Sequence, residues 1–407
     1  MASGQPRQRD GEPAGLVLAG GGARGAYEAG LLSVLLPELA RQGRRPTVFV
    51  GTSAGAINAT LFASLAHLPA EEAAAVALDR WRSVHAQMVF RPAWQTLPPL
   101  GVRYAAALAG SPERLTGLLD TGPLGRTLTT LMDWGQLRRN LVSGAVDALA
   151  VVTTECETGR TKVFYQDAGE APAGVPETDD ERAMDYLREE LTAEHVRASA
   201  AIPIAFPPVR LHDAPGSSWH MDGGVRLNAP LKPAIALGAR RLVVVATDPP
   251  FHRPSSAAVG RPAPSIQDAT GQLLHGAMAD RMIEDLIVLA KLNKLLAAGG
   301  AGARSRSGRP YQVIPFVFGG PDTQGTLGAK AEEVLGEVLR GAGKLRHLDL
   351  ALLGGLLGAG PASRGDLLSY LFFEPAFMDA AIGLGRRDGE ALLARPPLWR
   401  DAEFPPG

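Results

Sequence analysis

Two glycine-rich turns, each between an apolar run and a helical pattern, constrain the fold of this chain more than any other feature. The first run, Leu16–Ala19, leads into Gly-Gly-Gly-Ala-Arg-Gly at positions 20–25, and leucines at spacings of three and four follow. The second run, Thr47–Val50, leads into Gly-Thr-Ser-Ala-Gly at 51–55 and then into the helical stretch 56–66. The order strand, helix, strand, helix predicts a parallel sheet with helices packed on it.

The rest of the chain continues this mixture of strands and helices. Its pattern predicts a β-hairpin over 148–165, a helix over 180–200, a buried strand over 241–246, a long amphipathic helix over 266–298 and a late strand over 311–318. Most of the last hundred residues have helical composition. We therefore expect an α/β protein whose C-terminal part is mainly helical.

Composition excludes several classes of protein. Lys and Arg number 41 and Asp and Glu 42, a balance that argues against nucleic acid as the main partner. The single cysteine, Cys156, excludes an internal disulfide framework and a cysteine-based zinc cluster. The N-terminus has no apolar signal core, and no apolar run reaches about 18 residues. We expect a cytoplasmic protein, with peripheral membrane binding and secretion by a non-Sec route left open.

The first glycine turn fits two uses. Gly20, Gly22 and Gly25 match the G-x-G-x-x-G pattern of a dinucleotide site between a strand and a helix. The same turn can present backbone N–H groups to an oxyanion at a helix N-terminus. A dinucleotide site also needs an acidic residue at the end of the second strand, where this sequence has Gly51-Thr52-Ser53. The missing carboxylate favours the oxyanion use.

Ser53 is the candidate nucleophile. Gly51, Ser53 and Gly55 form G-x-S-x-G directly after an apolar strand and before a helix, which is the context of a nucleophile elbow. Small residues are needed there because the serine occupies a sharp, strained turn. The alternative is a serine that caps the N-terminus of the following helix.

A nucleophilic serine needs a base, and Asp222 is the sharper candidate. None of the eight histidines lies in a strong loop motif behind a candidate acid, and His220 shares a short strand with Asp222. Asp222 ends that strand and begins Asp-Gly-Gly, which leaves its carboxylate unobstructed. An isolated Asp-Gly pair is more typical of a plain turn, so the assignment depends on the other motifs.

Three motifs in this order and spacing resemble the patatin-like phospholipase family: Gly20–Gly25, Gly51–Gly55 and Asp222–Gly224. The stretch Arg197–Pro207 resembles the segment that precedes the Asp-Gly-Gly of that family. The resemblance extends from about Leu16 to Asp248, and residues 368–372 are more weakly similar to the ending of bacterial members.

The resemblance implies a serine acyl hydrolase that cleaves carboxylic esters of lipids, as a phospholipase A, lysophospholipase or esterase. Ser53 would attack the ester carbonyl and Asp222 would act as base, without histidine, metal, calcium or cofactor. The implied oxyanion hole and its supporting turns are Gly20, Gly21, Gly22, Arg24 and Gly25, the elbow residues Gly51 and Gly55, and the turn residues Gly223 and Gly224. The implied fold is a three-layer α/β/α sandwich with a mainly parallel central sheet and a helical C-terminal extension.

For the domain organisation we expect a disordered lead-in over 1–14, a patatin-like catalytic domain over 15–250, and a C-terminal region over 251–407 that packs on it. Two other functions stay open. One is a dinucleotide-dependent oxidoreductase that uses the first glycine turn, and the other is a catalytically silent lipid-binding module.

A lipid substrate implies transient contact with a membrane or micelle surface. The net charge of −1 gives no general attraction to anionic lipid, so an apolar segment must make this contact. We expect Met88–Tyr104 to do so, with Trp94 at the headgroup level, ahead of the amphipathic helix over 266–298. The oligomeric state is left open.

Overall fold

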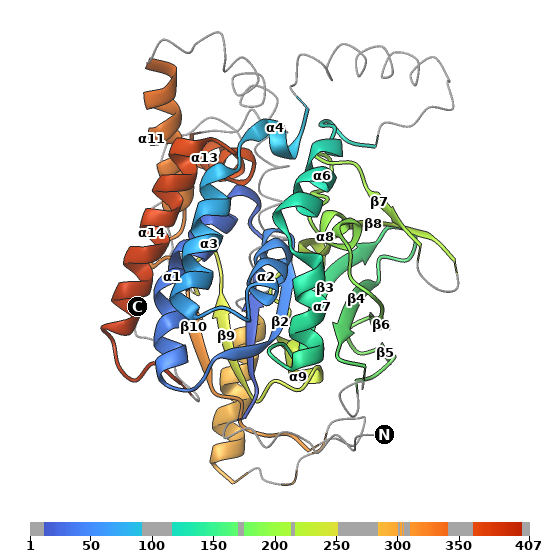
Figure 1. The fold of residues 1–407 in the computed structure, drawn as a ribbon. Coiled ribbons are helices and arrows are strands. Elements are labelled where there is room, and N and C mark those ends of the chain that lie inside the picture. Colours follow the sequence, from blue (N-terminus) through green and yellow to red (C-terminus); the bar gives the residue numbers. More distant parts are fainter. Residues whose placement is uncertain are drawn as a thin grey trace, which may run out of the picture.

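The computed structural model describes most of the chain, and Figure 1 shows its ribbon. The description covers residues 12–91, 116–169, 175–212, 216–250, 284–299, 302, 304, 310–340 and 361–400. Several expectations lie outside these ranges, namely most of the lead-in, Trp94 with most of its segment, and the first part of the helix over 266–298.

One sheet runs through the molecule. Its main path has the strand order β10-β9-β1-β2-β3-β4-β6-β5, and β8 pairs with both β3 and β7. The neighbours from β10 to β3 are parallel, whereas β4 and β8 run antiparallel to β3. The strands are β1 (Ala14–Leu18), β2 (Pro46–Thr52), β3 (Ala148–Glu155), β4 (Thr161–Asp167), β5 (Thr178–Asp179), β6 (Met184–Arg188), β7 (Val209–Leu211), β8 (Ser218–Asp222), β9 (Arg241–Val245) and β10 (Phe316–Gly319).

Helices connect these strands and cover the sheet (Figure 1). They are α1 (Gly25–Arg41), α2 (Ala54–Ser64), α3 (Ala70–Ser83), α4 (Ala86–Val89), α6 (Gly122–Leu131), α7 (Trp134–Ser143), α8 (Ala193–Ser199), α9 (Leu231–Ala236), α11 (Thr326–Arg340), α13 (Pro361–Leu371) and α14 (Pro375–Leu393). Residues 284–297 are also helical, and the short 3₁₀ turns η1 (Gly22–Arg24) and η2 (Gly223–Val225) follow β1 and β8.

The central strands are buried on both faces, which makes the fold three-layered. Successive side chains of a strand point to opposite faces, so Leu16 and Leu18 enter one apolar core and Val17 the other. The first core includes side chains of α1, α2, α3, α6, α7 and α14, and the second includes those of α9 and of residues 286–290. Parallel strands covered in this way have continuous apolar sequences, as both strand runs do. The predicted α/β/α sandwich is confirmed.

The helix predicted over 180–200 is wrong. Residues 184–188 form strand β6, which pairs in parallel with β4, and the helix α8 begins only at Ala193. Met184 and Tyr186 are buried while the residues between and after them are more exposed, which is a period of two. The helix-favouring Glu, Arg and Ala residues of this stretch concealed that alternation.

The C-terminal part contributes to the same sheet and to the same core. Strand β10 pairs in parallel with β9, and α14 lies along α1 and α3 on one face (Figure 1). The Tyr27 hydroxyl on α1 donates a hydrogen bond to Asp388 on α14, at 2.7 Å. The predicted helical C-terminal extension is confirmed.

No single described helix is long and apolar enough to cross a membrane. The consecutive helical segments Gly365–Leu371 and Pro375–Leu393 have the required length and composition only together, and they are bent by 106° at their junction. Phe377, Met378 and Ile382 of the second segment are buried in the first core.

Candidate active site

Ser53 lies at the sharp junction between β2 and α2. Its backbone has φ 55° and ψ −125°, a conformation that costs energy for any residue other than glycine. A Cβ atom at Gly51 would lie 2.1 Å from the Gly55 carbonyl oxygen, and one at Gly55 would lie 2.3 Å from the Leu18 carbonyl oxygen. Only glycine fits at these two positions, which explains the spacing of the motif.

The Ser53 hydroxyl does not cap the helix that it precedes. No side-chain hydrogen bond from Ser53 to the first turn of α2 is present, and the buried Oγ has no hydrogen-bond partner among the described residues. A capping serine would accept a backbone N–H. A strained serine with an unpartnered hydroxyl is instead typical of a functional site.

Ser199 fixes the backbone of Ser53. The Ser53 N–H donates to Ser199 Oγ at 2.8 Å, and the Ser199 hydroxyl donates to the Val152 carbonyl oxygen at 2.5 Å. Ser199 is fully buried at the end of α8. Ser199 lies in the stretch that resembles the family, but nothing in its local sequence pattern predicts a contact with residue 53.

The register of the sheet brings Asp222 next to Ser53. Thr52, the last residue of β2, lies opposite Val152 on β3, and the next β3 residue, Thr153, lies opposite Asp222 on β8. Strand β4 occupies the other edge of β3, so β2 and β8 lie end to end along the same edge, and Ser53, which follows β2, is brought close to Asp222, the last residue of β8. Asp222 Oδ1 accepts the Gly224 N–H at 2.7 Å, and Oδ2 is buried without a partner.

The environment of Asp222 shifts its acidity toward neutrality. Complete burial raises the pKa of Asp222 to about 7, while the nearby Ser53 hydroxyl and the Gly224 N–H act in the opposite direction. Ser53 is close enough to affect this pKa, yet the pair does not have the geometry of a hydrogen bond. Ser53 Oγ and Asp222 Oδ2 therefore lie close together without a hydrogen bond between them.

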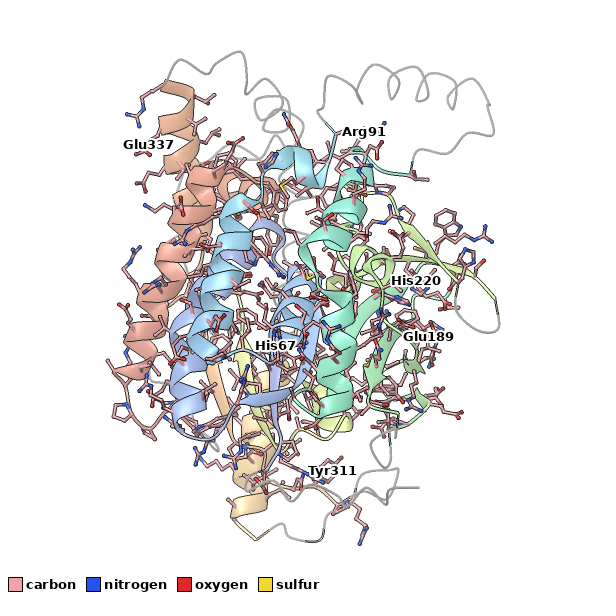
Figure 2. The ribbon with its side chains drawn as sticks, in the orientation of Figure 1. His67, Arg91, Glu189, His220, Tyr311 and Glu337 are labelled. Carbon is pink, nitrogen blue, oxygen red and sulfur yellow. The ribbon has the colours of Figure 1, made fainter. Side chains whose placement is uncertain are left out.

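His220 is engaged elsewhere. Its Nδ1 lies 2.9 Å from Thr153 Oγ1 and its Nε2 lies 2.9 Å from Ser218 Oγ, so both ring nitrogens have hydroxyl partners. Figure 2 shows His220 on the β7–β8 side of the molecule. His195 similarly pairs with Thr192 at the start of α8. His252, His275 and His347 lie outside the described residues.

Some N–H groups of the first glycine turn donate hydrogen bonds within the protein, and others do not. Gly20 donates to Asn228 Oδ1 at 2.7 Å, Arg24 to the Gly21 carbonyl, and Gly25 to carbonyls within the turn. No acceptor among the described residues is found for the N–H of Gly21 or Gly22. Gly22 has φ 56° and lines the same pocket as Ser53. A Cβ atom there would lie 2.2 Å from the Tyr370 carbonyl oxygen.

The Arg24 side chain joins this turn to the C-terminal part of the chain. Its Nε donates to Ser369 Oγ at 2.7 Å, Nη1 lies 3.3 Å from Asp248 and Nη2 lies 3.0 Å from Asp366. The guanidinium also stacks 4.1 Å from the centre of the Tyr370 ring. All three guanidinium nitrogens of Arg24 therefore have acceptors within the protein. The segment 368–372, which is weakly similar to the ending of bacterial family members, supplies one of these acceptors, Ser369.

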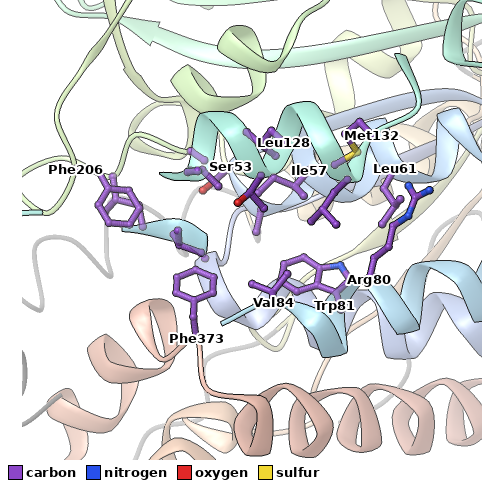
Figure 3. A pocket seen from close by; sticks show the side chains of 18 residues that line it. Ser53, Ile57, Leu61, Arg80, Trp81, Val84, Leu128, Met132, Phe206 and Phe373 are labelled. Carbon is purple, nitrogen blue, oxygen red and sulfur yellow. The ribbon is translucent and has the colours of Figure 1, made fainter. Parts of the chain in front are cut away.

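An apolar pocket opens beside Ser53 (Figure 3). It encloses about 650 Å³, including its open mouth. Its walls come mainly from α2, α3 and α6, with Phe206 and Phe373 near Ser53. The remaining lining residues are Gly22, Ala54, Ile57, Leu61, Arg80, Trp81, Val84, Val89, Leu124, Thr127, Leu128, Leu131, Met132, Ala200 and Ile202. In the described part of the chain no group of three or more His, Cys, Asp or Glu side chains is arranged to hold a metal ion.

The chain is similar to one protein family and to two solved structures. No curated protein matches the chain. VipD from Legionella pneumophila is similar over 76% of this chain and 61% of its own, with 18% identity and a TM-score of 0.33. Human GIVD cytosolic phospholipase A2 is similar over 93% of this chain and 60% of its own, with 11% identity and a TM-score of 0.37. The chain thus matches less than two thirds of the length of either structure. The model of patatin-like phospholipases matches residues 16–235, more than half of the 407 residues, and the chain belongs to that family.

Proposed function

We propose that this protein is a serine acyl hydrolase that cleaves carboxylic ester bonds of lipids, with Ser53 as nucleophile and Asp222 as general base. The observation that carries the proposal is the pair of buried, unpartnered oxygens, Ser53 Oγ and Asp222 Oδ2, beside an apolar pocket. Family membership supports lipid esters as the substrate class. The same assignment makes transient contact with a membrane or micelle surface part of the catalytic cycle.

In the first half of the reaction, Ser53 Oγ attacks the ester carbonyl carbon while Asp222 Oδ2 accepts the hydroxyl proton. The tetrahedral intermediate carries a negative oxygen, which the free N–H groups of Gly21 and Gly22 would stabilise. Each such donor is worth about 2.7–4 kcal/mol in the transition state. Collapse breaks the bond to the alcohol, which leaves with the proton from Asp222.

In the second half, Asp222 accepts a proton from water, and the resulting hydroxide attacks the acyl group on Ser53. The second tetrahedral intermediate collapses to a free fatty acid, and Ser53 recovers its proton from Asp222. One carboxyl group thus serves alternately as base and acid. A pKa of about 7 suits both tasks near neutral pH, because the two protonation states are then similarly populated.

The pocket supports an acyl chain as the group next to Ser53. Its lining is almost entirely aliphatic and aromatic, which favours burial of methylene groups at about 25 cal/mol per Å². Its volume is within the range of small-molecule sites. Phospholipase A, lysophospholipase and simple esterase activities are all compatible with this arrangement.

Hydrolysis of p-nitrophenyl esters and phospholipids by the wild type and by Ser53→Ala tests the proposal. We expect the variant to fold normally and to lose activity by at least about 10³-fold. A fluorophosphonate probe should label the wild type but not Ser53→Ala. The matched control is Ser33→Ala on α1, whose hydroxyl only donates to a carbonyl within its own helix and should be dispensable. Absence of both labelling and turnover in the wild type would favour the silent lipid-binding module.

A further inference from the structure

Among the described residues that line the pocket, Arg80 is the one cation, and it lies at the far end from Phe206 and Phe373. Figure 3 shows its guanidinium beside Leu61 and Met132, with Phe206 and Phe373 at the opposite end near Ser53. Apart from Arg80, Ser53 and Thr127, every lining side chain is apolar or glycine. Arg80 is partly exposed, but its Nη1 is buried here, and burial of a charged group without a partner is costly.

The Arg80 guanidinium has no partner in the described part of the protein. Its Nη1 is buried without a hydrogen bond, the side chain as a whole is partly exposed, and Arg80 forms no ion pair with a described carboxylate. The charge of Asp133, whose Oδ1 accepts the Gln136 N–H, opposes the larger lowering of the Arg80 pKa by burial. Arginine stays protonated in proteins, so a positive charge faces this end of the pocket.

Arg82, two residues further along α3, behaves as an ordinary surface arginine. Its side chain is 46% exposed and pairs with Asp79 at 3.3 Å and with Asp379 at 3.1 Å. The contrast shows that carboxylate partners are available on the surface of this helix. Arg80 forms no such ion pair and lines one end of the apolar pocket, where its Nη1 is buried.

The distance between the two polar ends sets the length of a ligand. Ser53, Ile57 and Leu61 line the pocket along one face of α2. Eight residues of helix at 1.5 Å each correspond to about 12 Å. An extended carbon chain advances about 1.25 Å per atom, given C–C bonds of about 1.5 Å at about 111°. The span therefore corresponds to a chain of about eight to ten carbons.

We propose that Arg80 binds the terminal carboxylate of an acyl chain whose other end is esterified and held at Ser53. The inference rests on the proposed ester hydrolysis and names its substrate class: esters of dicarboxylic acids of about eight to ten carbons, the type formed when the chain of an unsaturated lipid is cut by oxidation. A headgroup phosphate fits less well, since only a few bonds separate it from the scissile ester of a phospholipid. It cannot span an apolar wall of about 12 Å.

The experiment compares two p-nitrophenyl esters of equal carbon number, the nonanoate and the mono-ester of nonanedioic acid. The variants are Arg80→Met, which keeps length but removes charge, and Arg80→Lys, which keeps charge; Arg82→Met is the matched control. We expect the ratio of kcat/KM for the nonanedioate to that for the nonanoate to fall at least about tenfold in Arg80→Met, mainly through KM. Arg80→Lys should retain part of the preference, and Arg82→Met all of it.

A shorter substrate gives a second control. The mono-ester of hexanedioic acid carries the same charge but cannot reach Arg80, so Arg80→Met should not change its kcat/KM. An equal effect on the six- and nine-carbon diacid esters would overturn the inference, because it would indicate general electrostatic attraction.

Failure of the inference is separable from failure of the proposed function. An unchanged ratio in Arg80→Met, with hydrolysis still dependent on Ser53, would overturn the role of Arg80 alone. Calorimetry with Ser53→Ala and monomethyl nonanedioate tests the site without turnover. Binding that is weakened at least about tenfold by Arg80→Met supports the inference, and binding that is unaffected overturns it.

Discussion

The first glycine turn contacts two buried polar clusters that differ in how their atoms are paired. On one side, the three nitrogens of the Arg24 guanidinium each have an acceptor, from Ser369, Asp248 or Asp366. On the other side, Ser53 Oγ and Asp222 Oδ2 have none. The Arg24 cluster contains a full charge and the Ser53–Asp222 pair contains a carboxyl group with a pKa near 7, so both are expensive to bury.

This difference in pairing predicts that the Arg24 cluster stabilises the fold and that the Ser53–Asp222 pair serves the reaction. A buried charge with complete hydrogen bonding holds two parts of a fold together, and breaking it harms folding. Buried oxygens without partners lower stability, and for Ser53 Oγ and Asp222 Oδ2 the proposed chemistry supplies a reason to keep them. Variants in the first cluster should therefore change unfolding, and variants in the second should change turnover.

The largest effect is expected for Asp222→Asn. The amide keeps the shape of the side chain but cannot accept the Ser53 proton, so kcat should fall by about 10²–10⁴-fold. The unfolding midpoint in urea should not decrease, because a costly buried acid is removed. A variant that retains more than a tenth of wild-type turnover would show that Asp222 is not the base. Single replacement of His220, His252 or His275 by alanine should leave most activity.

Arg24→Met should produce the opposite pattern. Removal of the guanidinium leaves the buried Asp248 and the partly buried Asp366 unpaired, which should cost about 3–5 kcal/mol of stability. Chemical denaturation measures this loss. A matched control is Arg82→Met, whose exposed ion pairs should matter by less than about 1 kcal/mol. Equal stability of the two variants would mean that the Arg24 cluster is not structural.

Ser199→Ala should affect both quantities, because Ser199 connects the reactive turn to strand β3. Loss of its hydroxyl leaves the Ser53 N–H and the Val152 carbonyl unsatisfied, at a cost of about 1–3 kcal/mol for a buried group. We expect a lower denaturation midpoint together with a lower kcat and little change in KM. A change in KM alone would contradict a positioning role.

The last effect concerns pH, and it distinguishes the two roles proposed for Asp222. Turnover should rise about tenfold per pH unit below 7 and level off above it, since the base must be ionised. Stability should move the other way. The folded-state pKa is raised above that of the unfolded chain, so the folded protein binds the extra proton between about pH 4 and 7. The stability contributed by the protonated carboxyl is complete below about pH 4 and is lost as pH rises through 7.

The comparison with Asp222→Asn isolates this contribution from that of other groups. Glu28, whose pKa burial also raises, is present in both proteins and cancels in the difference. The stability of Asp222→Asn relative to wild type should therefore increase from pH 5 to pH 8. A difference that is constant across this range would contradict the raised pKa.

Local sequence predicted a parallel sheet covered by helices and selected Ser53, because it follows an apolar strand and the glycine spacing indicates a sharp turn without knowledge of the partner strands. The three-layer fold and the role of Asp222 were implied by the resemblance to the patatin-like family, since Asp-Gly-Gly at the end of a short polar strand is weak by itself. The strand over residues 184–188 was not predicted, because a two-residue period over five residues is a weak signal among helix-favouring side chains.

Long-range contacts were beyond such reasoning. Arg24 meets Asp366 and Ser369 more than 340 positions along the chain, and no local pattern specifies that pairing. Arg80 lies in an amphipathic helix among other charged residues, where an arginine is typical of a solvated face. The roles assigned to Trp94 and to residues 266–283 stay predictions, as they lie outside the described residues.

The contact between Gly22, Arg24 and the segment 366–370 has a consequence for biosynthesis. In a nascent chain, Ser53, Asp222 and most of the sheet are made long before the ribosome reaches residues 366–370. Until then, the Arg24 guanidinium lacks its Asp366 and Ser369 acceptors, and the backbone of Tyr370 does not yet pack on Gly22. The order of synthesis therefore delays completion of this turn until residues 366–370 have been made.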